Sequence, residues 1–183
     1  MRVKKNHCLF RVALRPSPNF SDRPDAEDIA LIVIHGISVP AGDFDSGLVD
    51  ALFTNTLPER LDPTLESLRG TRVSTHVFIS RSGKLTQYVP FDKRAWHAGE
   101  SSWRQRIGCN DFSVGIELEG TDQLPYTDAQ YESLHSVTRA LFARYPRLSA
   151  DAVVGHQEVA PLRKTDPGPG FDWPRYLGAL ATI

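Results

Sequence analysis

The chain has 183 residues, a length typical of one domain with a sizeable hydrophobic core. Its 21 Lys and Arg residues nearly balance its 22 Asp and Glu residues, which argues against a dedicated binder of nucleic acid or anionic lipid. No apolar run, including the one at residues 30–34, approaches the roughly 20 residues that cross a bilayer, so we expect no membrane insertion.

The N-terminal region predicts neither a secretory signal nor regular structure. Residues 1–8 carry positive charge, but no continuous apolar core follows them, so we expect a cytoplasmic protein. The two cysteines, Cys8 and Cys109, form no CxxC pair, which is typical of a reducing compartment. Residues 15–28 are rich in Pro, Asp, Ser and Asn, and we expect residues 1–28 to be a mostly irregular lead-in.

The first predicted strand comes directly before a histidine. Residues 30–34, Ala-Leu-Ile-Val-Ile, are an apolar and partly β-branched run typical of a strand buried on both faces, and His35 follows. Residues 48–53 favour a short helix. Residues 57–70 contain two prolines and mixed charge, and they favour a long surface loop.

Two further regions predict strands. Residues 73–79 and 85–89 flank the sequence Arg-Ser-Gly-Lys and predict a β-hairpin with glycine in its turn. Residues 113–119, Ser-Val-Gly-Ile-Glu-Leu-Glu, predict a strand that carries acidic residues near its end. Because the hairpin requires antiparallel pairing, a mixed sheet is favoured over a purely parallel one.

The clearest helix signal covers residues 128–144. Thr127 and Gln130 make a capping box at its start, and apolar side chains recur through it at helical spacing. After it, residues 153–154 predict a brief strand and residues 173–181 a last short helix. Strands interleaved with helices predict a single α/β domain with a mixed central sheet flanked by helices.

Two histidines and one aspartate form a candidate metal site. His35 and His156 each follow a predicted strand, where side chains project into the crevice at the edge of an α/β sheet. Asp166 lies in a turn rich in proline and glycine. Two imidazoles and one carboxylate leave the fourth tetrahedral position of zinc open, as in catalytic sites. A turn-forming role for Asp166 is the alternative, because no local motif such as HExxH is present.

Other polar residues are candidates for catalysis. Lys164 lies two residues before Asp166, so an extended loop places both side chains on one side, where a cation stabilises an oxyanion. Glu117 lies in a predicted buried strand and must be paired or functional, although Glu119 shares its face and is an alternative. His76 is either a rival metal ligand or a hydrogen-bonded core imidazole.

Six segments along the chain carry a longer pattern. They are residues 31–35 (LIVIH), 72–76 (RVSTH), 88–99 (YVPFDKRAWHAG), 110–120 (NDFSVGIELEG), 155–156 (GH) and 163–169 (RKTDPGP). In this order they resemble the AmpD-type 1,6-anhydro-N-acetylmuramyl-L-alanine amidases. The resemblance extends from about residue 16 to residue 173 and is therefore more specific than any single motif.

The resemblance implies a fold, a metal and a reaction. The fold is that of amidases and peptidoglycan-recognition proteins, as one amidase domain over the full 183 residues. One zinc ion per chain is assigned to His35, His156 and Asp166, and catalysis to Glu117 and Lys164. The implied reaction is hydrolysis of the amide bond between 1,6-anhydro-N-acetylmuramic acid and L-alanine of a muropeptide, in cell-wall recycling.

The expected partner is the anhydro-muropeptide substrate, and a monomer is favoured. Arg72 is expected to pair with a stem-peptide carboxylate, since a guanidinium binds it bidentately. Trp96 and His97 are expected to line the sugar side. The alternative function is a non-catalytic peptidoglycan-binding module of the same fold. Loss of a zinc ligand or of the general base would indicate that module, and the sequence retains all of them.

Overall fold

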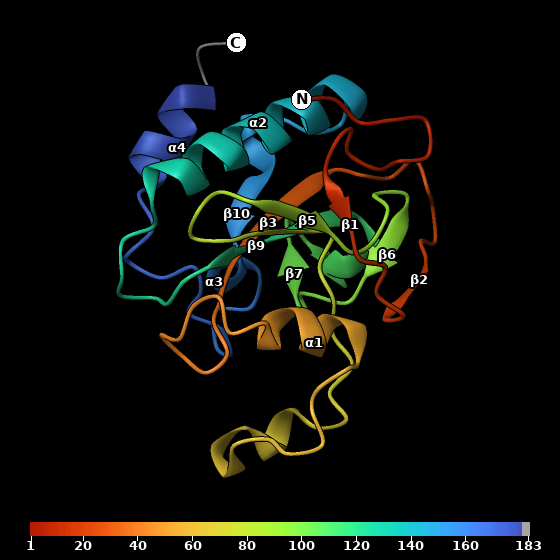
Figure 1. The fold of residues 1–183 in the computed structure, drawn as a ribbon. Coiled ribbons are helices and arrows are strands. Elements are labelled where there is room, and N and C mark those ends of the chain that lie inside the picture. The colour runs from red at the N-terminus through yellow and green to blue at the C-terminus, as the bar shows by residue number, and fades with distance from the viewer. Residues whose placement is uncertain (181–183) are drawn as a thin grey trace.

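The computed structural model describes residues 1–180, and a six-stranded mixed sheet lies at the centre (Figure 1). Its strands, in spatial order, are β1 (Ala13–Leu14), β5 (Leu85–Gln87), β4 (Val77–Ile79), β9 (Ser113–Glu119), β3 (Leu31–Ile37) and β10 (Val153–Gly155). Strands β4, β9, β3 and β10 run parallel to one another, whereas β5 is antiparallel to β4 and parallel to β1. The expected mixed α/β fold is therefore confirmed.

The remaining elements surround this sheet. Two small ribbons pair β2 (Phe20–Asp22) with β6 (Lys93–Ala95) and β7 (Ser102–Trp103) with β8 (Arg106–Ile107), both antiparallel. The α-helices are α1 (Leu48–Thr54), α2 (Asp128–Arg144), α3 (His156–Val159) and α4 (Trp173–Leu180). Short 3-10 helices cover Pro63–Leu68, Cys109–Asp111 and Ala150–Ala152. No helix within residues 1–180 combines the length and hydropathy needed to cross a membrane.

The two faces of the sheet differ in chemistry. Helices α2 and α4 lie on one side of the sheet and α1 on the other (Figure 1). Because successive side chains of a strand point to opposite faces, the even-numbered residues of β3 and β9 pack in the core under α2 and α4. The odd-numbered positions of β9 carry Ser113, Gly115, Glu117 and Glu119. The second face is therefore polar along β9, and the candidate site lies there.

Helix α2 has the predicted bounds because its start is fixed by side chains. Thr127 Oγ1 accepts a hydrogen bond from Gln130 N at 3.2 Å, and Thr127 N donates to Gln130 Oε1 at 3.0 Å. The Gln130 amide also donates to the carbonyl oxygens of Ile79 and Glu119. The capping box thus fixes α2 against the ends of β4 and β9.

Several predicted bounds differ from the structure. Strand β3 continues through Ile37, and the loop predicted at 57–70 contains a 3-10 helix at Pro63–Leu68. The strand predicted from residue 73 begins at Val77. Residues 74–76 instead make hydrogen bonds to Asn19, Trp96 and Gly115 that do not follow the pattern of a strand ladder. The lead-in over residues 1–28 contains the short strands β1 and β2. Residue 181, the predicted end of the last helix, lies outside the described residues.

Candidate metal centre

The register of the parallel strands brings three site residues to one level of the sheet. His35 in β3 pairs with Glu117 in β9. Gly155 in β10 pairs with Ile34, so the next residue, His156, lies at the level of His35. His156 is also the first residue of α3, which turns the chain away from the sheet at this point. As predicted, His156 directly follows a strand, whereas His35 lies within β3, which continues two residues further to Ile37.

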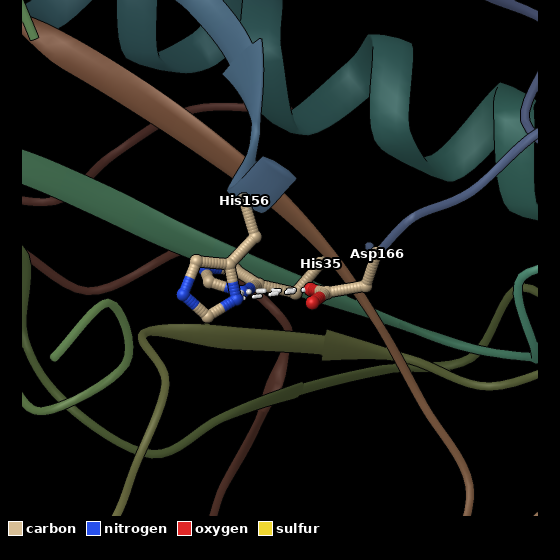
Figure 2. Close-up of side chains that lie close together, drawn as sticks. All are labelled: His35, His156 and Asp166. Carbon is tan, nitrogen blue, oxygen red and sulfur yellow. Dashed lines mark hydrogen bonds and ion pairs between the residues drawn. The ribbon is translucent and has the colours of Figure 1, made fainter. Parts of the chain in front are cut away.

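Three ligand atoms converge at this level (Figure 2). His35 Nδ1 lies 3.0 Å from His156 Nδ1 and 3.2 Å from Asp166 Oδ2, and His156 Nδ1 lies 3.1 Å from the same oxygen. Asp166 comes from the loop between α3 and α4. Two ligands of a tetrahedral zinc ion, each about 2.0–2.1 Å from the metal, lie about 3.4 Å apart. The triangle therefore fits one zinc ion with little adjustment.

The protonation states also suit a metal. Burial is the largest cause that lowers the pKa of His35, to about 4, so its imidazole is neutral at pH 7. Burial alone would raise the pKa of Asp166, but hydrogen bonds from His156 and His35 outweigh it and place the pKa far below its ordinary value. Zinc binds neutral imidazole and ionised carboxylate. Both groups are thus in the form that ligates.

Each metal-facing imidazole has a partner at its other nitrogen. His35 Nε2 lies 2.9 Å from His97 Nδ1, and His156 Nε2 lies 3.1 Å from the carbonyl oxygen of Ala98. In zinc sites such partners fix the tautomer and the ring orientation of the ligand. Local periodicity does not predict either contact, since both partners lie in a loop far from the ligands along the chain.

The loop that carries Asp166 is held from both sides. Gln157 N donates to Asp166 O at 3.0 Å, and the Tyr126 hydroxyl donates to Pro167 O at 3.2 Å. Gly36 leaves room for that hydroxyl, because a Cβ at position 36 would lie 2.3 Å from it. A glycine after the first ligand histidine therefore lets Tyr126 reach the loop that carries the carboxylate.

Glu117 is a buried carboxylate beside the three ligands. Its Oε1 lies 4.0 Å from His35 Nδ1, and its Oε2 has no hydrogen-bond partner within residues 1–180. Burial, and then the charge of Asp166, raise the pKa of Glu117 well above its ordinary value, while the charge of Lys164 lowers it. A buried carboxyl oxygen without a partner is costly to stability, so it indicates a group that acts on a ligand.

The structure separates Glu117 from the alternative Glu119. Glu119 accepts hydrogen bonds from the backbone N–H groups of Asp45 and Arg81, at 2.7 and 3.0 Å, and so holds two loops. Lys164 is half-buried, and its charge lowers the pKa of both His35 and Glu117. Glu117 therefore lies beside the ligand cluster, and the charge of Lys164 acts on it, whereas Glu119 is engaged by the two loops.

His76 has the surroundings of a core imidazole. It is fully buried, its Nδ1 accepts from the N–H of Gly115 at 3.0 Å, and its Nε2 lies 3.0 Å from the carbonyl oxygen of Lys93. Arg23 Nη2 lies 3.2 Å from the same Nε2. His76 is not a member of the ligand cluster. Of the two alternatives, its contacts match a hydrogen-bonded core imidazole and not a metal ligand.

The three expected substrate contacts lie in different environments. Arg72 is exposed and lines a pocket of about 190 Å³ beside α1. Trp96 is half-buried, with Nε1 3.4 Å from Ser21 Oγ. His97 is only 8% exposed and contacts His35, which differs from the expectation that it would line the sugar side. Within residues 1–180, neither Arg72 nor Trp96 bonds to the three metal-facing residues.

Comparison with known proteins places this geometry in a family. The family model described as N-acetylmuramoyl-L-alanine amidase matches residues 25–169. The chain is 55% identical over 166 residues to the 1,6-anhydro-N-acetylmuramyl-L-alanine amidase AmpD of Salmonella typhimurium (strain SL1344), covering 91% of this chain and 88% of that protein.

Solved structures agree with the sequence comparison. A crystal structure of a selenomethionine AmpD derivative superposes with a TM-score of 0.91 at 52% identity, covering 96% of this chain and 97% of that one. A complex of the amidase AmiD from E. coli with anhydro-N-acetylmuramic acid-L-Ala-D-γ-Glu-L-Lys superposes with a TM-score of 0.65 at 32% identity, covering 84% and 58% of the two chains. From the ligand triangle, the fold and these matches, the chain belongs to the N-acetylmuramoyl-L-alanine amidase family.

Proposed function

We propose that this protein is a zinc-dependent amidase that hydrolyses the bond between 1,6-anhydro-N-acetylmuramic acid and L-alanine in muropeptides, during cell-wall recycling in the cytoplasm. The single observation that carries the proposal is the triangle of His35, His156 and Asp166 beside the buried carboxyl of Glu117, whose Oε2 has no hydrogen-bond partner among residues 1–180. The names of the AmpD relatives support the substrate, since they specify the 1,6-anhydro-N-acetylmuramyl-L-alanine bond.

The ligand set suits a hydrolytic zinc site. His35, His156 and Asp166 would hold the ion through two Nδ1 atoms and one carboxylate oxygen. When bound, zinc polarises a scissile carbonyl and lowers the pKa of water. With three protein ligands, one tetrahedral position stays open for chemistry.

Two other side chains provide the proton transfer and the positive charge that stabilises the oxyanion. Glu117 takes a proton from the attacking water and passes it to the leaving amine of L-alanine, as a general base and then a general acid. A buried carboxylate with a raised pKa suits both roles. The positive charge of Lys164, which already lowers the pKa of His35, would stabilise the oxyanion that forms at the scissile carbonyl.

Substrate binding is proposed on both sides of the ligand cluster. Arg72 would pair with a stem-peptide carboxylate, and Trp96 would contact the sugar. An open pocket of about 700 Å³ beside α3 is lined by Gly99, Val159 and Leu162, among others, and offers further room for substrate. We propose one zinc ion per monomeric chain and the anhydro-muropeptide as partner. His97, which is buried, is assigned another role below.

The proposal is tested with purified protein and an anhydro-muropeptide. We expect about one zinc per chain by metal analysis, and release of the L-alanyl peptide by mass spectrometry. His35→Ala should lose both metal and activity, whereas the control His135→Ala, on α2, should keep both. Full activity after exhaustive chelation would reject zinc dependence. Tight binding of the muropeptide without turnover would instead favour the non-catalytic binding module.

A further inference from the structure

A second buried imidazole lies directly behind the metal-facing ring of His35. His97 Nδ1 is 2.9 Å from His35 Nε2, and the rings meet edge to face with centroids 5.0 Å apart. His97 Nε2 lies 3.2 Å from Ser113 Oγ. If His35 binds metal through Nδ1, its proton is on Nε2 and is donated to His97 Nδ1. His97 then carries its own proton on Nε2, which faces the serine hydroxyl.

Strand β9 leaves a space for this ring. Gly115 lies in the middle of the strand, and a Cβ added there would be 2.5 Å from His97 Cγ and 2.7 Å from His97 Nδ1. Its backbone conformation is not left-handed, so dihedral angles do not require glycine here. A glycine inside a strand weakens it and marks the close approach of another group. Here that group is the imidazole of His97.

The segment that carries His97 is fixed by one buried amide. Asn110 Oδ1 accepts hydrogen bonds from the N–H groups of His97 and Ala98, at 3.2 and 2.8 Å. The carbonyl oxygen of Ala98 in turn lies against His156 Nε2. Asn110 thus holds both groups that contact the outer nitrogens of the two metal-facing imidazoles.

We propose that His97 is a positioning residue that fixes the tautomer and ring orientation of His35 for zinc, and that Gly115 provides the space it needs. His97 does not act on substrate, because it is buried and both of its ring nitrogens are engaged. This inference rests on the zinc site proposed above. It adds to that site the residue that contacts the outer nitrogen of His35.

The first test measures affinity for Zn²⁺ by competition with a chromogenic chelator. We expect His97→Ala to weaken zinc binding about 10- to 100-fold, the range typical for such partners of ligand histidines. His97→Asn should retain most of the affinity, because its side-chain oxygen can accept the proton of His35 Nε2. His135→Ala is the matched histidine control and should bind zinc as the unchanged protein does.

A double-variant cycle tests the role of Gly115. Gly115→Ala should weaken zinc binding in the presence of His97, because the new methyl group displaces the ring. In the His97→Ala background the same change should have no further effect on zinc affinity, since the ring is gone. Independent, additive losses from the two substitutions would contradict the proposed contact.

A nitrogen NMR spectrum of the zinc-loaded, unsubstituted protein tests the tautomers without any variant. We expect a proton on His35 Nε2 and on His97 Nε2, and none on His97 Nδ1. A proton on His97 Nδ1, or unchanged zinc affinity in His97→Ala, overturns this inference while the zinc amidase proposal stands. Absence of zinc binding by the unsubstituted protein would overturn both.

Discussion

His35 and Glu117 are direct partners in the parallel pairing of β3 and β9, and both side chains leave the face of the sheet opposite α2. A metal-facing imidazole and the proposed base are therefore spaced by backbone hydrogen bonds of two central strands. Sites on strands hold geometry more tightly than sites on loops. Among the ligands only Asp166 comes from a loop, and that loop is held by Tyr126 and Gln157.

Replacing Glu117 by Gln should remove turnover and keep the metal. The amide has nearly the same shape, so zinc content should stay near one per chain, but it cannot accept the proton of the attacking water. We expect kcat to fall about 10²- to 10⁴-fold, the usual contribution of a general acid–base group. Metal analysis and single-turnover kinetics measure the two effects separately. Near-normal kcat would assign the base to another residue.

Replacing Lys164 by Met should lower kcat about 10²- to 10³-fold, the range found when one oxyanion-stabilising donor is lost. The methionine retains the apolar stem but carries no charge. KM should change little, because the oxyanion forms only in the transition state. Lys164→Arg restores the charge with a different shape and should recover part of the rate. Equal loss of kcat in both variants would point to packing instead of charge.

The free energy of unfolding should depend on pH through His76. Burial, and then the charge of Arg23, lower the pKa of His76 to about 3 in the folded state, below the ordinary value of 6.5. Between these values the unfolded chain binds a proton that the folded chain does not, so stability falls as pH falls from 6.5 toward 3. The contribution is at most about 1.4 kcal/mol per pH unit.

Denaturant unfolding of the unsubstituted protein and of the variant His76→Asn, each at several pH values, measures this contribution. His76→Asn keeps an acceptor for the N–H of Gly115 and should be less stable at pH 7, because its contact with Lys93 O is lost. Its stability should then decline less steeply with acid than that of the unsubstituted protein. Parallel pH dependences for the two proteins would show that His76 does not carry the effect.

Arg23 should contribute strongly to stability although no carboxylate among residues 1–180 forms an ion pair with it. Its guanidinium donates to the carbonyl oxygens of Phe91, Asn110, Asp111 and Ser113. Arg23→Met would leave buried acceptors without donors, and we expect a loss of about 3 kcal/mol or more in the free energy of unfolding. Thermal denaturation and denaturant titration measure the loss. Lys93→Met, which removes an exposed surface pair, is the control and should change stability little.

Local sequence signals predicted the elements that depend on nearby residues. Helix α2 has its predicted bounds because Thr127 and Gln130 cap it within one turn. Strand β9 also has its predicted bounds, because its alternation of apolar and polar residues matches a sheet with one polar face. Strand β2 was not predicted, since the exposed segment Phe20–Asp22 becomes a strand only by pairing with residues 93–95.

In the candidate site, too, local sequence signals indicated some residues, whereas a contact between residues far apart in the chain was not predicted. His35, His156 and Asp166 were found from strand ends and a rigid turn, and the resemblance chose Glu117 over Glu119. The contact of His97 with His35 depends on residues far apart in the chain, so periodicity could not predict it. One signal was present in the sequence, namely a glycine at position 115 within the predicted strand 113–119, because a glycine inside a strand marks a close approach.

The two outer strands of the central sheet are very short, with two residues in β1 and three in β10. A long flat edge offers a row of free N–H and C=O groups on which another chain can form a new strand. Such short edges present almost no template of this kind. Self-association by strand addition is thereby disfavoured, and a concentrated solution of the protein should resist fibril growth from its native state.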